Sequence, residues 1–130
     1  MLLVKTKIGP SKIEGIGLFA DEFIKCGTKV WGFEPKLDLV LSKEEVETLS
    51  PPAQQQFYKY AYLDKVRNKY LLCGDDGRFF NHSNTPNCDE KIDNDSTYAS
   101  RDIEKGEELT INYGDFYGNM NEHQEIGLGK

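Results

Sequence analysis

One polar stretch constrains the fold of this chain more than any other: residues 78–88, with the sequence RFFNHSNTPNC. Asparagine, serine and proline together are typical of a loop whose side chains hydrogen-bond back to the backbone. Because the loop follows directly on Phe79 and Phe80, which favour a buried position, one of its ends is held in place. A loop held in this way is a better candidate for binding a ligand than a solvated turn is.

A pair of glycines near the N-terminus indicates a second special position. Residues 14–20, with the sequence EGIGLFA, contain Gly15 and Gly17 on either side of Ile16 in a tight turn. Glycine here has two interpretations: a hairpin corner that needs a positive φ, or a backbone that must lie close to a ligand. By themselves these residues favour the hairpin corner.

A third stretch completes a recognisable set of motifs. Residues 105–114, KGEELTINYG, predict a turn followed by a strand that ends on Tyr113. Together the three stretches resemble the motifs of SET-domain protein lysine methyltransferases, which read G-x-G-x-F-A, R-F-x-N-H-S-x-x-P-N and G-E-E-L-T-x-x-Y. They occur in the family's order, and the resemblance covers roughly residues 4–117. A lone G-x-G would be weak, but the second and third motifs in this order are highly specific, and Tyr113 falls on the family's catalytic tyrosine.

Short apolar segments separated by turn signals predict a mostly β fold. The capping box of Ser42 and Glu45 predicts one helix that runs to about Leu49, and Ser50 followed by two prolines predicts a second over about residues 53–63. A hairpin with its turn at 93–95 is also expected. Strands are expected at residues 2–8, 18–20, 28–34, 70–73, 88–92, 96–101 and 108–113, with the segment up to 41 as a further candidate.

The resemblance implies the SET-domain fold, which is mostly β with a small helical insert, built from several short sheets with a C-terminal pseudoknot. Such knot-like threading is rare, and the periodicity of the sequence would not have predicted it. We expect the SET domain to cover residues 1–117, with the helical insert at about 42–63. Residues 118–130 form a polar tail without periodicity, for which we expect partial disorder.

Length and composition exclude several classes of protein. The 130 residues are enough for one domain with a single core. No apolar run of about 18 residues is present and the first residues lack a signal-peptide pattern, so we expect a soluble intracellular protein of the cytoplasm, nucleoid or nucleus. The spacing of the cysteines fits neither a disulfide framework nor a zinc site, so we expect buried or half-buried free thiols at Cys26, Cys73 and Cys88.

The net charge of −6 is unevenly distributed. Acids outnumber bases in residues 75–95 and again in 101–130, whereas bases outnumber acids in 54–73. An acidic half argues against nucleic acid as a direct partner and would favour a lysine- or arginine-rich peptide by electrostatic steering. Alternatively, the acids only keep the protein soluble, which charge alone does not exclude.

The chemistry of lysine methylation makes Tyr113 the candidate catalytic residue. Removing the proton of a free lysine at pH 7 costs about 4.6 kcal/mol, because its pKa is near 10.4. An aromatic channel and a nearby sulfonium cation both lower that pKa, so no strong base has to be encoded. We expect the Tyr113 hydroxyl to orient the acceptor amine and to interact with the sulfonium. By position alone, Tyr113 would be interpreted as a structural residue at the end of a strand, with its hydroxyl hydrogen-bonded. The surrounding motif favours the catalytic interpretation instead.

The resemblance implies S-adenosyl-L-methionine as the methyl donor, with main chain of the glycine turn against its methionine part. The amide of Asn81 can both donate and accept, which suits the amino-acid end of the cofactor. His82 could be a loop anchor, a metal ligand or a base, and we rank the loop anchor first. The resemblance implies that its backbone contacts the adenine. Three roles are open for Phe116 and Tyr117: stacking on the adenine, closing the lysine channel, or forming a hydrophobic clamp for the tail. The residues expected at the cofactor are Gly15, Ile16, Gly17, Asn81, His82, Tyr113, Phe116 and Tyr117.

The expected substrate channel is formed by Tyr58, Tyr62 and Ile111. Tyr58 and Tyr62 are four residues apart and share a helix face that either covers the domain or lines a groove. Ile111 replaces the Phe or Tyr that in many members is linked to the number of methyl groups added, so the product state stays open. Asn84 replaces a cysteine that binds zinc in many members, so we expect no metal.

The expected function is therefore methyl transfer to a lysine of a basic protein, such as a histone or another chromosomal protein. A catalytically silent SET-like module that binds a basic peptide is the alternative, and the presence of both Tyr113 and Asn81 favours the enzyme. The chain resembles the minimal, free-standing SET proteins of viruses and microbes, for which a homodimer that completes the groove is one expectation. We expect no direct contact with nucleic acid or membrane.

Overall fold

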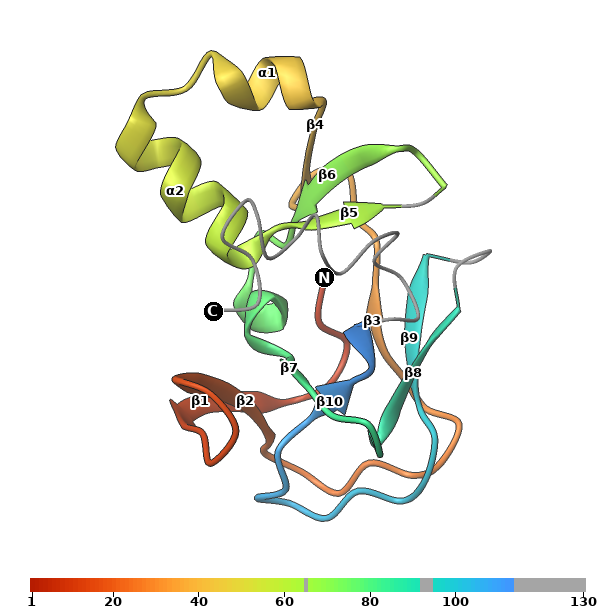
Figure 1. Cartoon of the computed structure of the whole chain (residues 1–130). Helices are drawn as coiled ribbons and strands as arrows, with labels where there is room; N and C mark the ends of the chain where they lie inside the picture. The colour runs from red at the N-terminus through yellow and green to blue at the C-terminus, as the bar shows by residue number, and fades with distance from the viewer. Residues whose placement is uncertain (65, 92–94, 114–130) are drawn as a thin grey trace.

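The structure is a computed structural model that describes residues 1–64, 66–91 and 95–113. Short strands dominate these residues, which confirms the prediction of a mostly β fold with a small helical insert (Figure 1). The helices are α1 (Lys43–Glu47), α2 (Pro51–Tyr60) and the 3-10 helix η1 (Asp76–Phe79). The strands are β1 (Thr6–Pro10), β2 (Ile16–Ala20), β3 (Lys29–Gly32), β4 (Leu39–Leu41), β5 (Tyr62–Asp64), β6 (Lys69–Leu72), β7 (Asn81–His82), β8 (Cys88–Lys91), β9 (Ser96–Ala99) and β10 (Thr110–Ile111).

These strands form several small sheets rather than one large sheet. β1 and β2 form an antiparallel hairpin, while β3-β9-β8 and β4-β6-β5 form two antiparallel sheets. β7 and β10 pair in parallel. In Figure 1, α1 and α2 lie beside the β4-β6-β5 sheet, and the short β7–β10 pair lies between the other sheets. Elements from distant parts of the sequence therefore meet around β7 and β10.

One main hydrophobic core joins the small sheets. Leu18 of β2, Val30 of β3, and Leu109 just before β10 are fully buried in it. A second, smaller cluster around Val46 and Phe57 packs the helices against the β4-β6-β5 sheet. Strands this short are not stable alone, so the shared core is what holds each sheet in place. In the described part of the chain, no helix is long and apolar enough to cross a membrane.

Local signals in the sequence predicted several elements correctly. At the start of α1, the Ser42 hydroxyl accepts from the Glu45 N–H at 3.1 Å, and the Ser42 N–H donates to Glu45 Oε1 at 2.9 Å, which is the expected capping box. Ser50 caps α2, whose first residue is Pro51. The predicted hairpin is confirmed as β8 paired with β9.

Some predicted bounds are wrong for physical reasons that were not visible in the sequence. The first strand lies at residues 6–10 instead of 2–8, and it pairs as far as Pro10, because an edge strand tolerates proline. The second helix ends at Tyr60, since Ala61 adopts an extended conformation with ψ 161°, and Tyr62 therefore belongs to β5 instead of the helix. β5 and β7 were missed because strands of two or three residues carry almost no periodic pattern.

Several predictions concern residues outside the described part of the chain. These are most of the turn at 93–95, Phe116, Tyr117 and the polar tail at 118–130. The described residues show β10 paired in parallel with β7, and the expected C-terminal threading stays a prediction. The domain bounds at 117 and 118 stay a prediction.

The position of Leu109 in the core leads to a stability prediction. Leu109 is fully buried, and its N–H donates to the Leu18 carbonyl at 2.7 Å. Leu109→Ala should lower the free energy of unfolding by about 2–5 kcal/mol, measured by urea denaturation, because it removes buried carbons and leaves a cavity. Leu39→Ala, at a position that is 47% exposed, is the matched control and should change it by about 0.5 kcal/mol or less. Equal losses in the two variants would contradict this account of the core.

Candidate active site

The parallel β7–β10 pair joins the two polar motifs. Thr110 lies beside Asn81, and Ile111 beside His82. The pairing continues into the loop, because the Ser83 N–H donates to the Ile111 carbonyl at 2.9 Å. The asparagine–histidine loop and the tyrosine motif, which are far apart in the sequence, therefore form one site.

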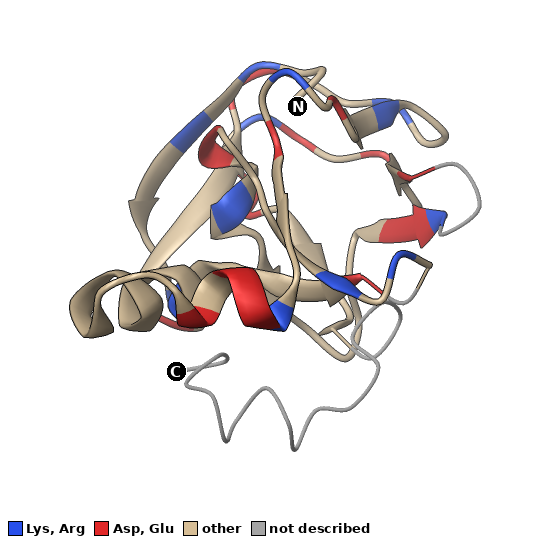
Figure 2. Cartoon of the chain, turned by 90° about the horizontal axis from the view of Figure 1, so that it is seen from above, with Lys and Arg blue, Asp and Glu red and all other residues tan. Residues whose placement is uncertain are grey.

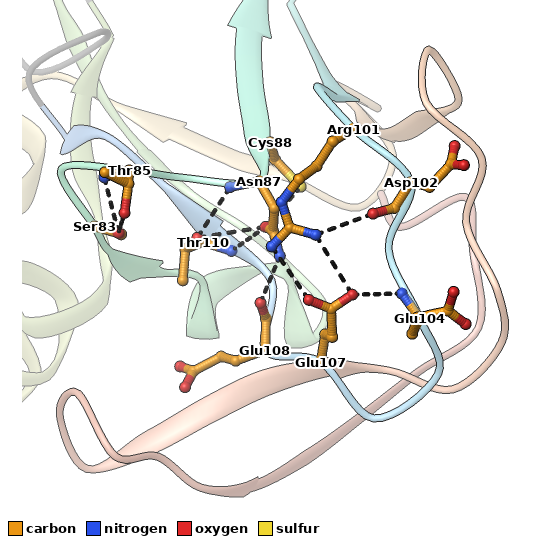
Figure 3. Close-up of polar contacts among 10 residues, drawn as sticks. All are labelled: Ser83, Thr85, Asn87, Cys88, Arg101, Asp102, Glu104, Glu107, Glu108 and Thr110. Atoms are coloured by element: carbon orange, nitrogen blue, oxygen red, sulfur yellow. Dashed lines mark hydrogen bonds and ion pairs between the residues drawn. The ribbon is translucent and has the colours of Figure 1, made fainter.

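Asn87, the last asparagine of the polar loop, holds this arrangement together (Figure 3). Its side chain donates to the Glu108 carbonyl at 2.8 Å and accepts from the Thr110 N–H at 2.9 Å. Its own backbone N–H donates to the Thr110 hydroxyl at 3.2 Å. Asn87 is only 3% exposed, so these bonds satisfy buried groups that have no access to water. One side chain thus fixes the start of β10 against the end of the loop.

A second network holds the glycine turn against the site. The Asn81 amide donates to the Glu14 carbonyl at 3.1 Å and to Glu108 Oε2 at 2.8 Å. The same carboxylate accepts from the Ser11 hydroxyl at 2.9 Å. A Cβ on Gly17 would lie 2.4 Å from Glu108 Oε2, so any larger residue here would displace the Glu108 carboxylate from its present position. Gly15, with a φ of +46°, is the residue of the turn that needs glycine for its backbone conformation.

Tyr113 follows β10 and faces the loop. Its hydroxyl donates to the Phe80 carbonyl at 3.0 Å, and its N–H donates to His82 Nδ1 at 3.1 Å. Because Nδ1 accepts, the proton of a neutral His82 lies on Nε2, which is 3.1 Å from Asn84 Oδ1. Burial, with a contribution from the Glu14 and Glu108 carboxylates, raises the pKa of Tyr113 to about 12. Tyr113 is therefore a neutral phenol at physiological pH, and His82 positions its backbone.

Two adjoining cavities meet at Tyr113. The larger has a volume of about 390 Å³ and is lined by the glycine turn and the asparagine–histidine loop. The smaller has a volume of about 60 Å³, and five of its twelve lining residues are aromatic. The two share five lining residues, which are Lys59, Tyr60, Arg78, Phe80 and Tyr113. The two cavities are therefore neighbours, and Tyr113 is one of the five residues between them.

Most of the residues expected at the site line one of these cavities. Tyr62 and Ile111 line the smaller cavity. Tyr58 lines neither; its ring packs 5.3 Å from the Tyr70 ring within the second hydrophobic cluster. Gly17 is not among the lining residues either. Of the residues expected at the cofactor, those that line the larger cavity are Gly15, Ile16, Asn81, His82 and Tyr113.

Sequence reasoning did not assign several residues that build the site. Trp31 and Tyr60 line the smaller cavity, and Tyr60 also lines the larger one. Nothing local distinguishes them, because Trp31 looks like a core residue of its strand and Tyr60 like a packing residue of its helix. Asn87 and Glu108 could have been found, since both lie inside the recognised motifs. Their buried or paired positions show that part of each motif serves the structure around the site.

The cysteines do not form a metal site in the part of the chain that is described. Among residues 1–64, 66–91 and 95–113, no group of three or more His, Cys, Asp or Glu is placed to hold a metal ion. Cys73 and Cys88 are buried thiols, as predicted, and burial raises the pKa of both. Cys26 is exposed, contrary to the prediction, because it lies in the turn before Gly27. The expectation that the protein uses no zinc stays a prediction.

The larger cavity fits a ligand with both apolar and charged parts. Ile13 and Ile16 line it although they are 49% and 48% exposed, so a ligand there would cover apolar surface that the protein leaves in water. Glu14 and Arg78 line the same cavity and have the charges that a zwitterionic amino-acid group would pair with. The volume lies in the range of small-molecule sites, about 300–1,000 Å³. The residues present therefore fit S-adenosylmethionine, the cofactor that SET domains use.

The fold and site define a class of protein, and comparison with known sequences identifies it. Residues 15–114 match the SET domain family. Because this match covers most of the chain, the chain belongs to the SET-domain family of lysine methyltransferases. The histone-lysine N-methyltransferase of Schizosaccharomyces pombe that is specific for lysine 37 of histone H3 is 34% identical over 113 residues, covering 84% of this chain and 73% of that protein.

Other relatives are more distant or much longer. Human histone-lysine N-methyltransferase 2D is 29% identical over 113 residues, which cover 79% of this chain but 2% of that protein. A Plasmodium falciparum protein assigned to the histone methyltransferases has a crystal structure that superposes with a TM-score of 0.61 at 25% identity, covering 91% of this chain and 100% of that chain. A structure of ctPRC2 bound to S-adenosylmethionine has a TM-score of 0.66 at 24% identity and covers 94% of this chain and 16% of that chain, which shows a shared fold.

The hydrogen bonds of Asn87 predict a large loss of stability when the side chain is replaced by an apolar one of similar volume. Asn87→Leu would leave the Glu108 carbonyl and the Thr110 N–H without their partner. Unfolding by urea should show a loss of about 2–5 kcal/mol, because each buried group without a partner costs about 1–3 kcal/mol. The matched change Asn84→Leu, at an exposed position, should cost much less. A small loss for Asn87→Leu would mean that β10 does not depend on this side chain.

The pKa of Tyr113 predicts a dependence of stability on alkaline pH. The unfolded chain releases the tyrosine proton near pH 10, whereas the folded chain holds it up to about pH 12. The free energy of unfolding should therefore fall as the pH rises from about 10 to 12, and Tyr113→Phe should remove part of that fall. Urea denaturation of both proteins at several alkaline pH values measures this. Tyr98→Phe keeps Tyr113 and should follow the wild type; parallel curves for all three proteins would contradict the prediction.

Proposed function

We propose that the chain is an S-adenosylmethionine-dependent methyltransferase that acts on a lysine of a basic protein such as a histone. The observation that carries this proposal is the position of Tyr113 among the five residues that line both of two adjoining cavities. Methyl transfer needs a donor and an acceptor that approach from separate sites and meet at one point. The larger cavity has the volume of a small-molecule site and would take the donor, while the smaller cavity, whose walls include Trp31 and Tyr62, would take the aliphatic chain of a lysine.

Named residues would hold the donor in the larger cavity. Ile13 and Ile16 would cover its apolar parts, while Glu14 and Arg78 would pair with its amino-acid charges. Asn81, whose amide nitrogen already anchors the glycine turn, would act mainly by keeping that turn in position. When bound, S-adenosylmethionine supplies an electrophilic methyl group on a sulfonium sulfur.

The smaller cavity would prepare the lysine amine. Its aromatic walls, including Trp31, Tyr60 and Tyr62, would desolvate the side chain and so lower the pKa of the amine. With its proton lost to solvent, the amine would direct its lone pair at the methyl carbon. Forming the N–C bond and breaking the bond between methyl carbon and sulfur would give a positively charged methylammonium group and a neutral thioether, so charge and atoms balance.

Tyr113 would orient the amine at this point. Its hydroxyl donates to the Phe80 carbonyl, and a phenol oxygen can accept at the same time, so an N–H of the acceptor can bind there. With its pKa raised to about 12, the phenol does not act as a base at neutral pH. Its contribution is therefore positional and electrostatic, as in sites where fixed dipoles stabilise developing charge.

A basic protein substrate is supported by two observations. The net charge of −6 would steer a cationic segment toward the chain. Figure 2 shows Lys and Arg interspersed with Asp and Glu along the ribbon of the described residues. The relatives named above act on histone lysines, so a histone or another chromosomal protein is the first substrate to test.

The test of this proposal uses labelled S-adenosylmethionine, a panel of basic proteins that includes histones, and mass spectrometry to locate the label. Label should appear on lysine, and Tyr113→Phe should reduce the rate by about 100-fold or more while cofactor affinity by calorimetry changes little. Tyr98→Phe is the matched control, because Tyr98 lines neither cavity. Cofactor binding without transfer to any protein would favour a silent binding module, and absence of cofactor binding would refute the proposal.

A further inference from the structure

One arginine joins the two sheets that both contribute walls to the smaller cavity. Arg67 lies in the turn between β5 and β6 of the β4-β6-β5 sheet, and Asp95 immediately precedes β9 of the β3-β9-β8 sheet. The guanidinium donates two hydrogen bonds to the Asp95 carboxylate, from Nη1 to Oδ1 at 3.0 Å and from Nη2 to Oδ2 at 2.6 Å. In Figure 1, the turn of residues 66–68 and the start of β9 lie on the same side of the molecule. This bidentate pair is a strong contact with a defined geometry.

Two further contacts fix the same guanidinium. Nη1 also donates to the Asp64 carboxylate, whose other oxygen accepts from the Val66 N–H at 2.9 Å. The central carbon of the guanidinium lies over the ring of Phe33, 4.1 Å from its centre, and Phe33 directly follows β3. A planar guanidinium can bind carboxylates at its edge and an aromatic ring on its face, which a lysine amine cannot reproduce. We call Arg67 together with Asp64, Asp95 and Phe33 the arginine clasp.

The arginine clasp lies next to the smaller cavity along three segments of the chain. Three of its members are each two residues from a residue that lines this cavity: Tyr62 precedes Asp64, Trp31 precedes Phe33, and Thr97 follows Asp95. Residues two apart in a strand point to the same face of the sheet, as Tyr62 and Asp64 do on β5. The Phe33 N–H donates to the Asp95 carbonyl at 2.9 Å, which continues the pairing of β3 with β9. The clasp therefore holds the two sheets together one step beyond the residues that line the cavity.

The larger cavity does not share these walls. Among the described residues, those that line it come from the glycine turn, the end of α2, residues 78–82 and Tyr113. None of them belongs to the strands of the β3-β9-β8 or β4-β6-β5 sheets. A change in the separation of these two sheets should therefore alter the smaller cavity and leave the larger one nearly unchanged.

We propose that the arginine clasp sets the separation of the two sheets and so fixes the width of the smaller cavity, which makes Arg67 a positioning residue for the acceptor side chain. The effect on the acceptor rests on the proposed function, because that function assigns the smaller cavity to the lysine. The cavity has a volume of only about 60 Å³, so a small shift of one wall changes the fit of a bound chain. A displacement of about 1 Å can slow a reaction between positioned groups by about 100-fold.

Loss of the guanidinium should open the clasp. The Asp64 side chain is 8% exposed, and a carboxylate that loses its cation at such a position is drawn toward water. The Asp95 carboxylate binds the same guanidinium, so the two negative charges would face each other without the cation between them and would repel. Both effects move the two sheets apart at this end.

Trp31 makes the opening measurable without substrate or cofactor. It is the single tryptophan of the chain, is 3% exposed and lines the smaller cavity. Quenching of its fluorescence by acrylamide therefore reports access to the wall of the cavity. The wild type should be quenched weakly, and Arg67→Met, which keeps much of the length but removes the charge and the fork, should raise the quenching constant several-fold.

Three variants make the test specific. Arg101→Met removes an arginine from an exposed ion pair with Glu107 and should leave the quenching unchanged. Ile24→Ala, a change in the main core at a residue that lines neither cavity, should lower the stability without raising the quenching under native conditions. Arg67→Lys keeps the charge without the fork, so it should give an intermediate increase, and it keeps the test usable if Arg67→Met folds poorly.

The methyl-transfer assay adds a second measurement. In Arg67→Met, KM for the acceptor protein should rise by about tenfold, while the Kd of S-adenosylmethionine by calorimetry should change by less than about twofold. A purely structural role would weaken both. Unchanged quenching in both Arg67 variants, or equal losses in acceptor and cofactor binding, would overturn the inference. Absence of methyl transfer in the wild type would count against the proposed function alone, because the quenching comparison still tests the clasp, so the two failures are distinguishable.

Discussion

The site depends on the buried hydrogen bonds of Asn87. This side chain bonds to the backbone on both sides of Leu109, at Glu108 and Thr110, and so holds the start of β10 against the end of the asparagine–histidine loop. Two-residue strands such as β7 and β10 have too few ladder bonds to stay paired alone. The amide supplies the missing bonds, and Leu109 between them is buried in the main core. This junction adds to the direct hydrogen bonds from Tyr113 to His82 and Phe80, which hold the tyrosine in place.

From this junction the site extends in two directions with different physical character. Toward the N-terminus, the Glu108 carboxylate joins Ser11 and Asn81 in a polar network that shapes the turn of residues 14–16. Toward the β3-β9-β8 sheet, the smaller cavity adds the side chains of Trp31 and Tyr62 to the walls. The two cavities adjoin beside the neutral phenol of Tyr113. The proposed reaction would use this arrangement to bring two separately bound groups together.

Much of the fold and site could be predicted from local signals. The capping box at Ser42, the proline start of α2 and the β8–β9 hairpin each depend on a few neighbouring residues, and each was predicted correctly. The motifs identified the loop and the tyrosine strand because they combine residue types that rarely occur together at that spacing. Predictions that depended on the end of an element were less reliable. The helix ends at Tyr60 instead of near residue 63, which moves Tyr62 onto β5 and leaves Tyr58 packed in the second hydrophobic cluster.

The sequence by itself determined the family, the mostly β character and the identity of Tyr113 as the candidate catalytic residue, because these follow from short motifs and from patterns along the chain. Only the tertiary structure decided which side chains share a cavity. Trp31, Tyr60 and Glu90 come from three separate elements, and no spacing in the sequence relates them. Their meeting is set by strand order and by packing against one core, which involve contacts between residues far apart in the chain. The same reason explains why the contact between Gly17 and the Glu108 side chain could not be predicted from the sequence.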